Sequence, residues 1–443
     1  MEKNVRQKVF KILYEINEKD AFSNMAINKN IKGIRDNDIG LVREIVYGVL
    51  ENKIYIDFII KKFSKIKLRK ISPAIKNILE MGIYQIIFLD RIPDSAAVNE
   101  SVKLSKKYGH KGTHGFVNGV LRNVVRNKNK IELPDKKNNP IQYLSVKYSH
   151  PEWMIKKWIK DYGYSFAEGI CIANNKKPHL NIRVNTLKTS REELFHSLES
   201  KNLKVKYTKY AKEGLIIENP KNITRLKEFK DGLFQIQDES SMLVGQIMNP
   251  KDNSFIIDVC SAPGGKSTHL AEKMNNRGKI IARDIYNHKL ELIEENIKRL
   301  GTNIITTEKF NGLELDKKLL EKVDYCLVDA PCSGLGLIRR KPDIKWTKKE
   351  NNLEELIKLQ YQILNNGSKY VKKGGTLIYS TCTTNKEENI KIIKKFLAEN
   401  KDFTLKGFDD LVKDIEGAEK GFIELYPNIH NVDGFFIAKL IKK

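Results

Sequence analysis

Two cysteines in this sequence each follow a short apolar run with the composition of a β-strand. Cys332 lies in DAPCSG at residues 329–334, and Cys382 lies in STCT at residues 380–383. If the two runs form neighbouring strands, Asp329, Cys332 and Cys382 meet at one edge of the sheet. Loops at strand ends carry function more often than strand interiors do, so we interpret the two cysteines together as reactive thiols.

Two thiols beside a carboxylate suit one reaction on a pyrimidine ring. Carbon 5 of the ring is a poor nucleophile, but a thiolate that adds to carbon 6 creates an enamine whose carbon 5 can attack a sulfonium methyl group. Carbon 5 must then lose its proton and the thiolate must leave, which requires a second group as base or proton relay. Asp329 can bind N3 and the exocyclic amine of the base. A nearby cation such as Lys266 can favour the thiolate. These residues alone leave open which cysteine attacks.

The stretch DVCSAPGGKS at residues 258–267 follows a predicted strand and opens a helix. Its glycines let the backbone approach a ligand, and a helix N-terminus favours negative groups. The next predicted strand ends at Asp284, nineteen residues after Gly265. An acidic side chain at about 20 residues from such a turn binds ribose hydroxyls, so the pattern predicts an adenosine-type cofactor. The candidate cofactor-binding residues in the turn are Cys260, Ser261, Ala262, Pro263, Gly264, Gly265 and Lys266.

Two other classes of protein remain as alternatives. Gly265, Lys266 and Ser267 match the GK[ST] ending of a P-loop, but Cys260 stands where that loop has its first glycine. Magnesium-dependent ATP hydrolysis would reveal such an ATPase. A non-catalytic RNA-binding or assembly factor is the second alternative, and the presence of both DAPC and STC argues against it.

From residue 236 onward, short apolar runs alternate with amphipathic helical patterns at 286–300 and 351–371. This rhythm predicts an α/β domain with a largely parallel sheet and helices on both faces. Ligands bind at the carboxyl ends of the strands in such sheets, where the candidate residues lie. The predicted strands are FIIDVC, GKIIARD, NIITTE, VDYCLVD, GGTLIYST and DGFFIAKL.

The rest of the chain predicts two further domains. Residues 1–135 carry apolar residues at helical spacing with little alternation, which indicates an all-helical domain. The polar, proline-bounded segment 127–140 predicts a linker. Residues 141–235 mix helical patterns with short runs of β-forming residues and fit a small α+β module before the domain at 236–443.

Composition and charge limit the class of protein. The 443 residues exceed the size of a single growing core. The net charge of +25 is typical of a protein that binds a polyanion such as nucleic acid, and residues 1–140 hold 28 Lys and Arg against 15 Asp and Glu. The five cysteines are odd in number and lack metal-ligand spacing, so the sequence supports neither a disulfide framework nor a zinc site. We expect a cytoplasmic protein that spans no membrane.

Four motifs in order, DVCSAPGGKS, DAPCSGLG, RRKPDIKW and STCTTNKEEN, resemble the RsmB (Sun/Fmu) family of S-adenosylmethionine-dependent ribosomal RNA cytosine-5 methyltransferases. RVNTLK at 183–188 and FQIQDESSML at 234–243 resemble that family's lead-in segments. PDSAAVNESVKLSKKYG and GFVNGVLRNV resemble its NusB-like RNA-binding domain. The resemblance implies an all-α NusB-like N-terminal domain and a Rossmann-like class I methyltransferase domain. The implied partner is 16S ribosomal RNA.

The resemblance also implies roles for individual residues. Cys260 to Lys266 would line the methionine and adenosine parts of the cofactor, and Asp284 would hold its ribose. Asp329 would lie between the cofactor and the target base. Cys382 would be the nucleophile, and Cys332 would assist product release. Only the resemblance assigns the attack to Cys382.

One position departs from the family pattern. After the third strand the family has an Asp that would contact the adenine amine, whereas this chain has Asn311 in EKFNGLEL. An amide oxygen still accepts a hydrogen bond, so we expect weakened cofactor affinity at most. The target cytosine must leave its stack to reach the sheet edge, which favours a single-stranded or loop cytosine.

Overall fold

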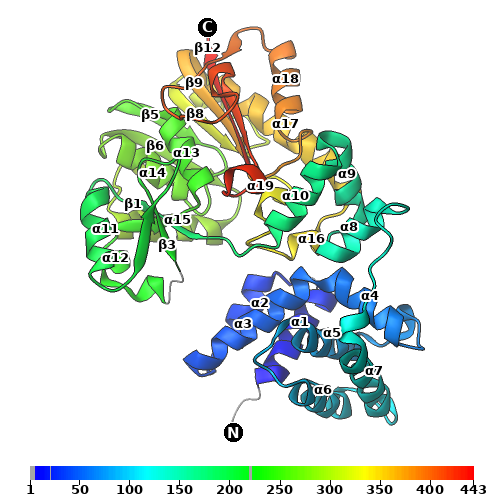
Figure 1. The fold of residues 1–443 in the computed structure, drawn as a ribbon. Coiled ribbons are helices and arrows are strands. Elements are labelled where there is room, and N and C mark those ends of the chain that lie inside the picture. Colours follow the sequence, from blue (N-terminus) through cyan, green and yellow to red (C-terminus); the bar gives the residue numbers. More distant parts are fainter. Residues whose placement is uncertain (1–4, 20, 219–221) are drawn as a thin grey trace. The chain divides into compact units, whose positions relative to one another are not determined.

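The computed structural model describes residues 5–19, 21–218 and 222–443, and the chain forms two compact units. The first unit comprises Met1–Asn175 and Arg340–Lys348, and the second comprises Lys176–Arg339 and Lys349–Lys443. Figure 1 shows an all-helical unit and a unit built around strands.

The first unit is helical because apolar residues recur at three- and four-residue spacing and bury one face of each helix. In α1, for example, Val9, Ile12 and Leu13 are completely buried in the common core. Short 3₁₀ turns lie at Leu68–Lys70 and Lys128–Lys130. The helices are α1 (Val5–Lys19), α2 (Ser23–Asn30), α3 (Asp36–Glu51), α4 (Lys53–Phe63), α5 (Pro73–Phe88), α6 (Asp94–Tyr108), α7 (Thr113–Asn127), α8 (Pro140–Tyr148), α9 (Glu152–Tyr162) and α10 (Tyr164–Asn174).

The segment Arg340–Lys348, which contains most of the RRKPDIKW motif, also belongs to the first unit. Its short helix α16 (Ile344–Thr347) lies against the end of α3. Trp346 Nε1 donates to the carbonyl oxygen of Leu50 at 2.8 Å, and Lys345 Nζ donates to that of Glu51 at 2.9 Å. Residues 340–348 therefore pack with the helices, whereas Arg339, the first residue of the motif, pairs with Asp433 at 2.6 Å in the second unit.

The second unit begins with a small antiparallel sheet in the order β2-β3-β1-β4. Its buried face packs on the amphipathic helix α11 (Arg191–Glu199), which starts with a capping box between Ser190 and Glu193. The predicted middle module 141–235 is thus distributed over both units, because α8, α9 and α10 group with the first. The remaining elements here are β1 (Leu180–Val184), β2 (Lys204–Tyr207), β3 (Gly214–Glu218), α12 (Lys227–Lys230) and β4 (Phe234–Ile236).

The larger sheet has the order β10-β12-β9-β8-β5-β6-β7, with β11 paired to β12. The strands β5 to β9 pair in parallel, as the alternating pattern predicts, and β12 is antiparallel to β9. The strands are β5 (Ser254–Asp258), β6 (Gly278–Asp284), β7 (Ile305–Lys309), β8 (Val323–Asp329), β9 (Val371–Thr381), β10 (Phe403–Leu405), β11 (Phe422–Leu425) and β12 (Phe435–Lys442).

Helices cover both faces of this sheet, so successive strand residues enter two separate cores. Ile256 packs in a core with residues of α13 (Glu239–Met248), α14 (Gly265–Lys273) and α15 (Asn287–Leu300). The next residue, Ile257, packs in a core with α17 (Leu353–Tyr370) and α18 (Ile390–Glu399). Figure 1 shows α17 and α18 beside the C-terminal strands. The predicted doubly covered α/β sheet is confirmed. The short helix α19 (Pro427–His430) precedes β12.

None of the helices within the described ranges is both long enough and apolar enough to cross a bilayer.

Candidate active site

The parallel pairing of β8 with β9 brings the two cysteine loops together. Asp329, the last residue of β8, is paired with Ser380 near the end of β9. Cys332 and Cys382 follow a few residues later on adjacent loops, and their Sγ atoms lie 3.1 Å apart. Gly336 donates its backbone N–H to the carbonyl oxygen of Cys382 at 3.1 Å, which fixes one loop on the other.

A hydrogen-bonded ion pair lies next to the thiols. Lys266 Nζ is 2.5 Å from Oδ2 of Asp329, and Ser380 Oγ donates to Oδ1 of the same carboxylate at 2.7 Å. Burial alone would lower the pKa of Lys266, but the Asp329 carboxylate offsets this and the net pKa is raised. A thiolate at Cys382 would raise that pKa further, so the charged forms of the two side chains attract each other. Lys266 therefore supplies a permanent positive charge at this edge.

The surroundings of Cys332 favour its protonated form. The hydrogen bond to Cys382 and burial together raise the pKa of Cys332 well above its usual range, and the charges of Glu388 and Asp329 act in the same direction. Cys332 therefore holds its proton at neutral pH. Either sulfur could be the donor across the 3.1 Å contact, and a protonated Cys332 would donate to a thiolate at Cys382.

The completely buried carboxylate of Glu388 connects the two cysteine loops. Glu388, within STCTTNKEEN, accepts from the backbone N–H of Ser333 at 2.8 Å and from its hydroxyl at 2.6 Å. Asn385 Nδ2 and Gln360 Nε2 also donate to Glu388, each at 2.9 Å. Thr383 Oγ1 donates as well, at 3.4 Å, and among the described residues these hydrogen bonds satisfy the carboxylate without a cation. Glu388 was not among the predicted site residues, because its role requires two loops that are distant in sequence.

The glycine turn lies at the carboxyl end of β5 and begins α14. Gly264 precedes the helix with a φ of 91°, in the left-handed region, and a Cβ there would meet Ile293 at 2.9 Å. A Cβ added to Gly265 would make only an ordinary van der Waals contact, with Gln237 at 3.8 Å. The Ser261 hydroxyl donates to the carbonyl oxygen of Arg283 at 2.9 Å, which ties the turn to β6.

Arg183 supports this turn from β1, and the sequence pattern did not identify it as a functional residue. It is completely buried and forms an ion pair with Glu272 at 2.7 Å. Its guanidinium also donates to the carbonyl oxygen of Gly265 at 2.6 Å and to Gln237. Arg183 lies in RVNTLK and Gln237 in FQIQDESSML, so both lead-in segments hold the first turn of α14.

The residues around the turn fit a nucleoside cofactor with a charged amino-acid part. Asp258, fully buried, accepts from Ser267 Oγ at 2.6 Å through Oδ2, while its Oδ1 has no partner among the described residues. Burial raises the pKa of Asp258 to about 7. Asp284 ends β6, and its Oδ1 accepts from the backbone N–H of Tyr286 at 3.2 Å. Carboxylates therefore stand at the ends of β5 and β6, on either side of the glycine turn.

The remaining predicted residues take different places. Asn311 follows β7, and its Oδ1 already accepts from the backbone N–H of Leu313 at 3.1 Å. Cys260 is half-buried in the glycine turn, and burial raises its thiol pKa. Cys326 inside β8 and Cys171 in α10 are fully buried, as expected of packing residues. Ala262 packs on the core beneath α14, and Pro263 offers its carbonyl oxygen to Asn296 at 3.0 Å.

Three protein families match successive parts of the chain. The NusB family matches residues 3–126, and the ferredoxin-like domain of RsmF/B-like methyltransferases matches residues 150–224. The 16S rRNA methyltransferase RsmB/F family matches residues 245–441. This last range contains the glycine turn, the ion pair and both loop cysteines.

Individual proteins match nearly the whole chain. The probable ribosomal RNA small subunit methyltransferase B of Bacillus subtilis is 38% identical over 99% of each chain. The crystal structure of PH0851 is 27% identical over 98% of each chain, with a TM-score of 0.83. NSun6 from Pyrococcus horikoshii, solved with the S-adenosylmethionine analogue SFG, is 26% identical over 66% of this chain and 98% of its own, with a TM-score of 0.60. The chain therefore belongs to the 16S rRNA methyltransferase RsmB/F family of S-adenosylmethionine-dependent enzymes.

Proposed function

We propose that the chain transfers a methyl group from S-adenosylmethionine to carbon 5 of a cytosine in 16S ribosomal RNA through a covalent bond between Cys382 and carbon 6. The observation that carries this proposal is the 3.1 Å separation of the Cys332 and Cys382 sulfurs beside the Lys266–Asp329 pair.

The residues around the glycine turn would hold the cofactor. Asp284 would accept from the ribose hydroxyls, and the backbone of Gly264 and Gly265 would allow close approach. The free Oδ1 of Asp258 would accept from the cofactor's amino group. Asn311 would offer its amide near the adenine. When bound, S-adenosylmethionine supplies an electrophilic methyl group and departs as a neutral thioether.

Cys382 and Asp329 would act on the base. The thiolate of Cys382 forms a bond to carbon 6, and the electron pair of the ring's double bond then becomes available at carbon 5. Asp329 accepts from the exocyclic amine and places the ring, while Lys266 balances the charge of the carboxylate and thiolate. Carbon 5 forms its bond to the methyl carbon.

Cys332 would complete the reaction. Cys332 would act as a proton relay, passing its own proton to the departing sulfur of Cys382 and taking up the proton of carbon 5. The electron pair of the broken C–H bond re-forms the ring double bond and expels the sulfur of Cys382. Cys332 holds a proton at hydrogen-bond distance from that sulfur and can stabilise it as it leaves. The target base must be unstacked to enter the site, which favours a single-stranded or loop cytosine. Residues 1–135 and 141–235 would hold the RNA, and 236–443 would carry the chemistry.

Methyl transfer can be tested with tritiated S-adenosylmethionine and unmethylated 16S ribosomal RNA. Cys382→Ser should lower the rate by on the order of a thousandfold or more, because the hydroxyl is a poor nucleophile at carbon 6. Cys171→Ala, which removes a buried thiol in the first unit, is the matched control and should retain activity. Label entering as fast with Cys382→Ser as with the unchanged chain would reject the mechanism.

Cys332→Ala separates attack from release. This variant should still bond to carbon 6 but release product slowly, so an RNA–protein band resistant to denaturation should accumulate. The double variant Cys332→Ala/Cys382→Ser should show no such band. A Cys332→Ala enzyme that turns over at the normal rate without a trapped band would remove Cys332 from product release.

A further inference from the structure

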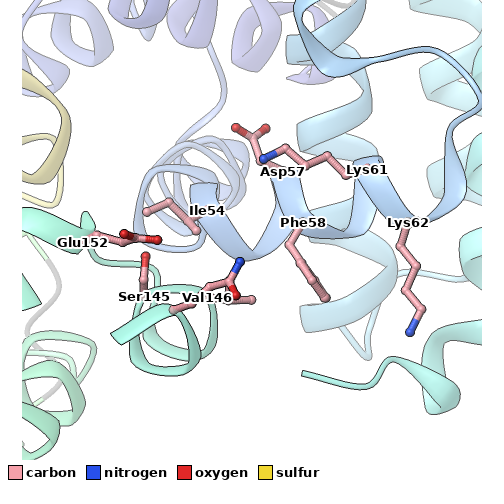
Figure 2. A pocket seen from close by; sticks show the side chains of 9 residues that line it. Ile54, Asp57, Phe58, Lys61, Lys62, Ser145, Val146 and Glu152 are labelled. Carbon is pink, nitrogen blue, oxygen red and sulfur yellow. The ribbon is translucent and has the colours of Figure 1, made fainter. Parts of the chain in front are cut away.

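The first unit contains an open pocket between α4 and α8, shown in Figure 2. Its volume is about 590 Å³, within the range of about 300–1,000 Å³ typical of small-ligand sites. We call it the α4–α8 pocket. Its lining residues are Ile54, Asp57, Phe58, Lys61, Lys62, Gln142, Ser145, Val146 and Glu152.

The walls of this pocket are fixed by hydrogen bonds. Ser149 Oγ, just after α8, accepts from the backbone N–H of Ile54 at 2.7 Å and so holds the start of α4. Ser145 Oγ donates to the carbonyl oxygen of His150 at 2.7 Å. The α4–α8 pocket is therefore a built feature of the unit.

The lining of the pocket has an apolar side and two different polar sides. Ile54, Phe58 and Val146 supply the apolar surface, including one aromatic ring. Lys61 and Lys62 stand on α4 together with Asp57, which pairs with Lys76, and Glu152 lies on the other side, at the start of α9. A planar group with an anionic end and amino edges would match this division.

The rim lysines begin a dense positive stretch, which we call the basic segment (residues 61–70). It contains six basic residues and no acidic one, and all six side chains are exposed. Within the described part of the chain, none of the six forms an ion pair. By contrast, the neighbouring Lys76 pairs with Asp57 at 3.0 Å. The six are Lys61, Lys62, Lys65, Lys67, Arg69 and Lys70.

Helix capping explains only part of this charge. Lys61 and Lys62 occupy the last turn of α4, where cations favour the helix dipole. The other four residues lie beyond Phe63, where that benefit ends. Unpaired like charges repel one another, and a polyanion laid across them relieves that repulsion.

We propose that the α4–α8 pocket and the basic segment form a binding site for single-stranded RNA. An unstacked base enters the pocket and stacks on Phe58, and the phosphates on either side lie along Lys61, Lys62 and Lys65. Glu152 and Gln142 face the polar edge of the base. Single-strand binders combine an aromatic stacking surface with a basic track in this way. The inference rests on the proposed function insofar as RNA is the substrate.

The test uses the full chain and a fluorescent single-stranded RNA that contains no cytosine, so that the methyl-accepting site does not contribute. Lys61→Ala/Lys62→Ala/Lys65→Ala should weaken binding about tenfold or more at 0.15 M salt. The salt dependence of the binding constant should fall by about 0.7 for each lost phosphate contact. The control Lys11→Ala/Lys106→Ala/Lys111→Ala removes the same charge from exposed lysines outside the pocket. Equal weakening by both triple variants would overturn the proposal.

The pocket itself is tested by Phe58→Leu, which keeps an apolar side chain and removes the ring. Loss of one stacked base should weaken binding by at least about fivefold. With a 4-thiouridine RNA and long-wavelength light, the crosslinked peptides should come from residues 53–65 and 140–152. Crosslinks found only elsewhere, or competition by polyglutamate as effective as by RNA, would overturn the proposal in favour of a different ligand.

The outcomes separate this inference from the proposed function. The lysine triple variant should raise KM for ribosomal RNA and leave kcat at saturating RNA unchanged, because the pocket lies outside the reacting groups. Normal RNA binding by the triple variant, together with a reaction that depends on Cys382, would reject only the RNA-binding role of the pocket and leave the proposed chemistry in place. Weak RNA binding together with an active Cys382→Ser enzyme would reject only the proposed chemistry.

Discussion

Ser380 Oγ donates a hydrogen bond of 2.7 Å to Oδ1 of Asp329, and the two residues are direct partners in the parallel pairing of β9 with β8. The ladder therefore fixes one oxygen of the carboxylate while Lys266 holds the other. The two hydrogen bonds, from Ser380 and from Lys266, therefore restrict the rotation of the Asp329 side chain. This preorganisation is what placing a target base requires.

Removing the Ser380 hydroxyl should loosen the Asp329 carboxylate without unfolding the sheet. We expect Ser380→Ala to lower kcat for methyl transfer by about tenfold, since one neutral-to-charged hydrogen bond contributes about 1.5–3 kcal/mol. Ser380→Thr retains the hydroxyl and should restore most of the rate. Unchanged kcat in Ser380→Ala would contradict the role.

Glu388 should be essential for the arrangement of the two cysteine loops. Glu388→Gln keeps the shape but presents an amide nitrogen to the donors of Ser333, Gln360 and Asn385. At least one buried donor then lacks an acceptor, at a cost of about 1–3 kcal/mol in the free energy of unfolding. We expect a lower Tm and a rate lowered in parallel, with the thiols no longer held at hydrogen-bond distance. Mild oxidation with diamide, which should join Cys332 to Cys382 in the unchanged chain, should be slower in this variant.

The buried ion pair between Arg183 and Glu272 permits a test that separates folding from cofactor binding. Arg183→Met leaves Glu272 buried without its cation and should cost about 3–5 kcal/mol in the free energy of unfolding. The double variant Arg183→Met/Glu272→Met should recover most of that loss. Both variants lack the donor to the Gly265 carbonyl, so both should bind S-adenosylmethionine more weakly, which calorimetry can measure. Full recovery of cofactor affinity in the double variant would show that Arg183 acts through stability alone.

His269 should make the second unit sensitive to acid. Burial, together with the charges of Arg183 and Lys273, lowers the pKa of His269 to about 4, although Glu213 acts in the opposite direction. The unfolded chain takes up this proton near pH 6.5, so the unfolded state binds more protons between pH 6.5 and 4. The stability present above pH 6.5 is therefore lost as the pH falls towards 4, by about 3 kcal/mol.

Thermal unfolding at several pH values checks this expectation. His269→Gln should flatten the fall in Tm between pH 6.5 and 4, because glutamine takes up no proton. His196→Gln, at an exposed position, should leave the pH dependence unchanged. A steep fall that persists in His269→Gln would assign the acid sensitivity to other groups, such as Glu213, whose own pKa is lowered by His269 and Lys273 against the effect of burial.

The sequence by itself determined which residues stand at strand ends. Apolar runs followed by Asp258, Asp284, Asp329 and Cys382 are local patterns, and parallel pairing follows from their alternation with helices. The glycine turn could be predicted as well, because it too is a local sequence pattern. The short strands β10 and β11 were missed, because three or four residues carry too little periodicity to distinguish them from a loop.

Tertiary structure alone decided which distant side chains support those residues. Arg183 reaches Gly265 across more than eighty residues of sequence, and Glu388 reaches Ser333 from the next loop. It also decided that residues 340–348 pack among the helices of the first unit. Such contacts depend on where strands and helices are placed in space, and burial then selects the polar partner that satisfies each group. The local periodicity of the sequence therefore does not predict which polar groups become partners.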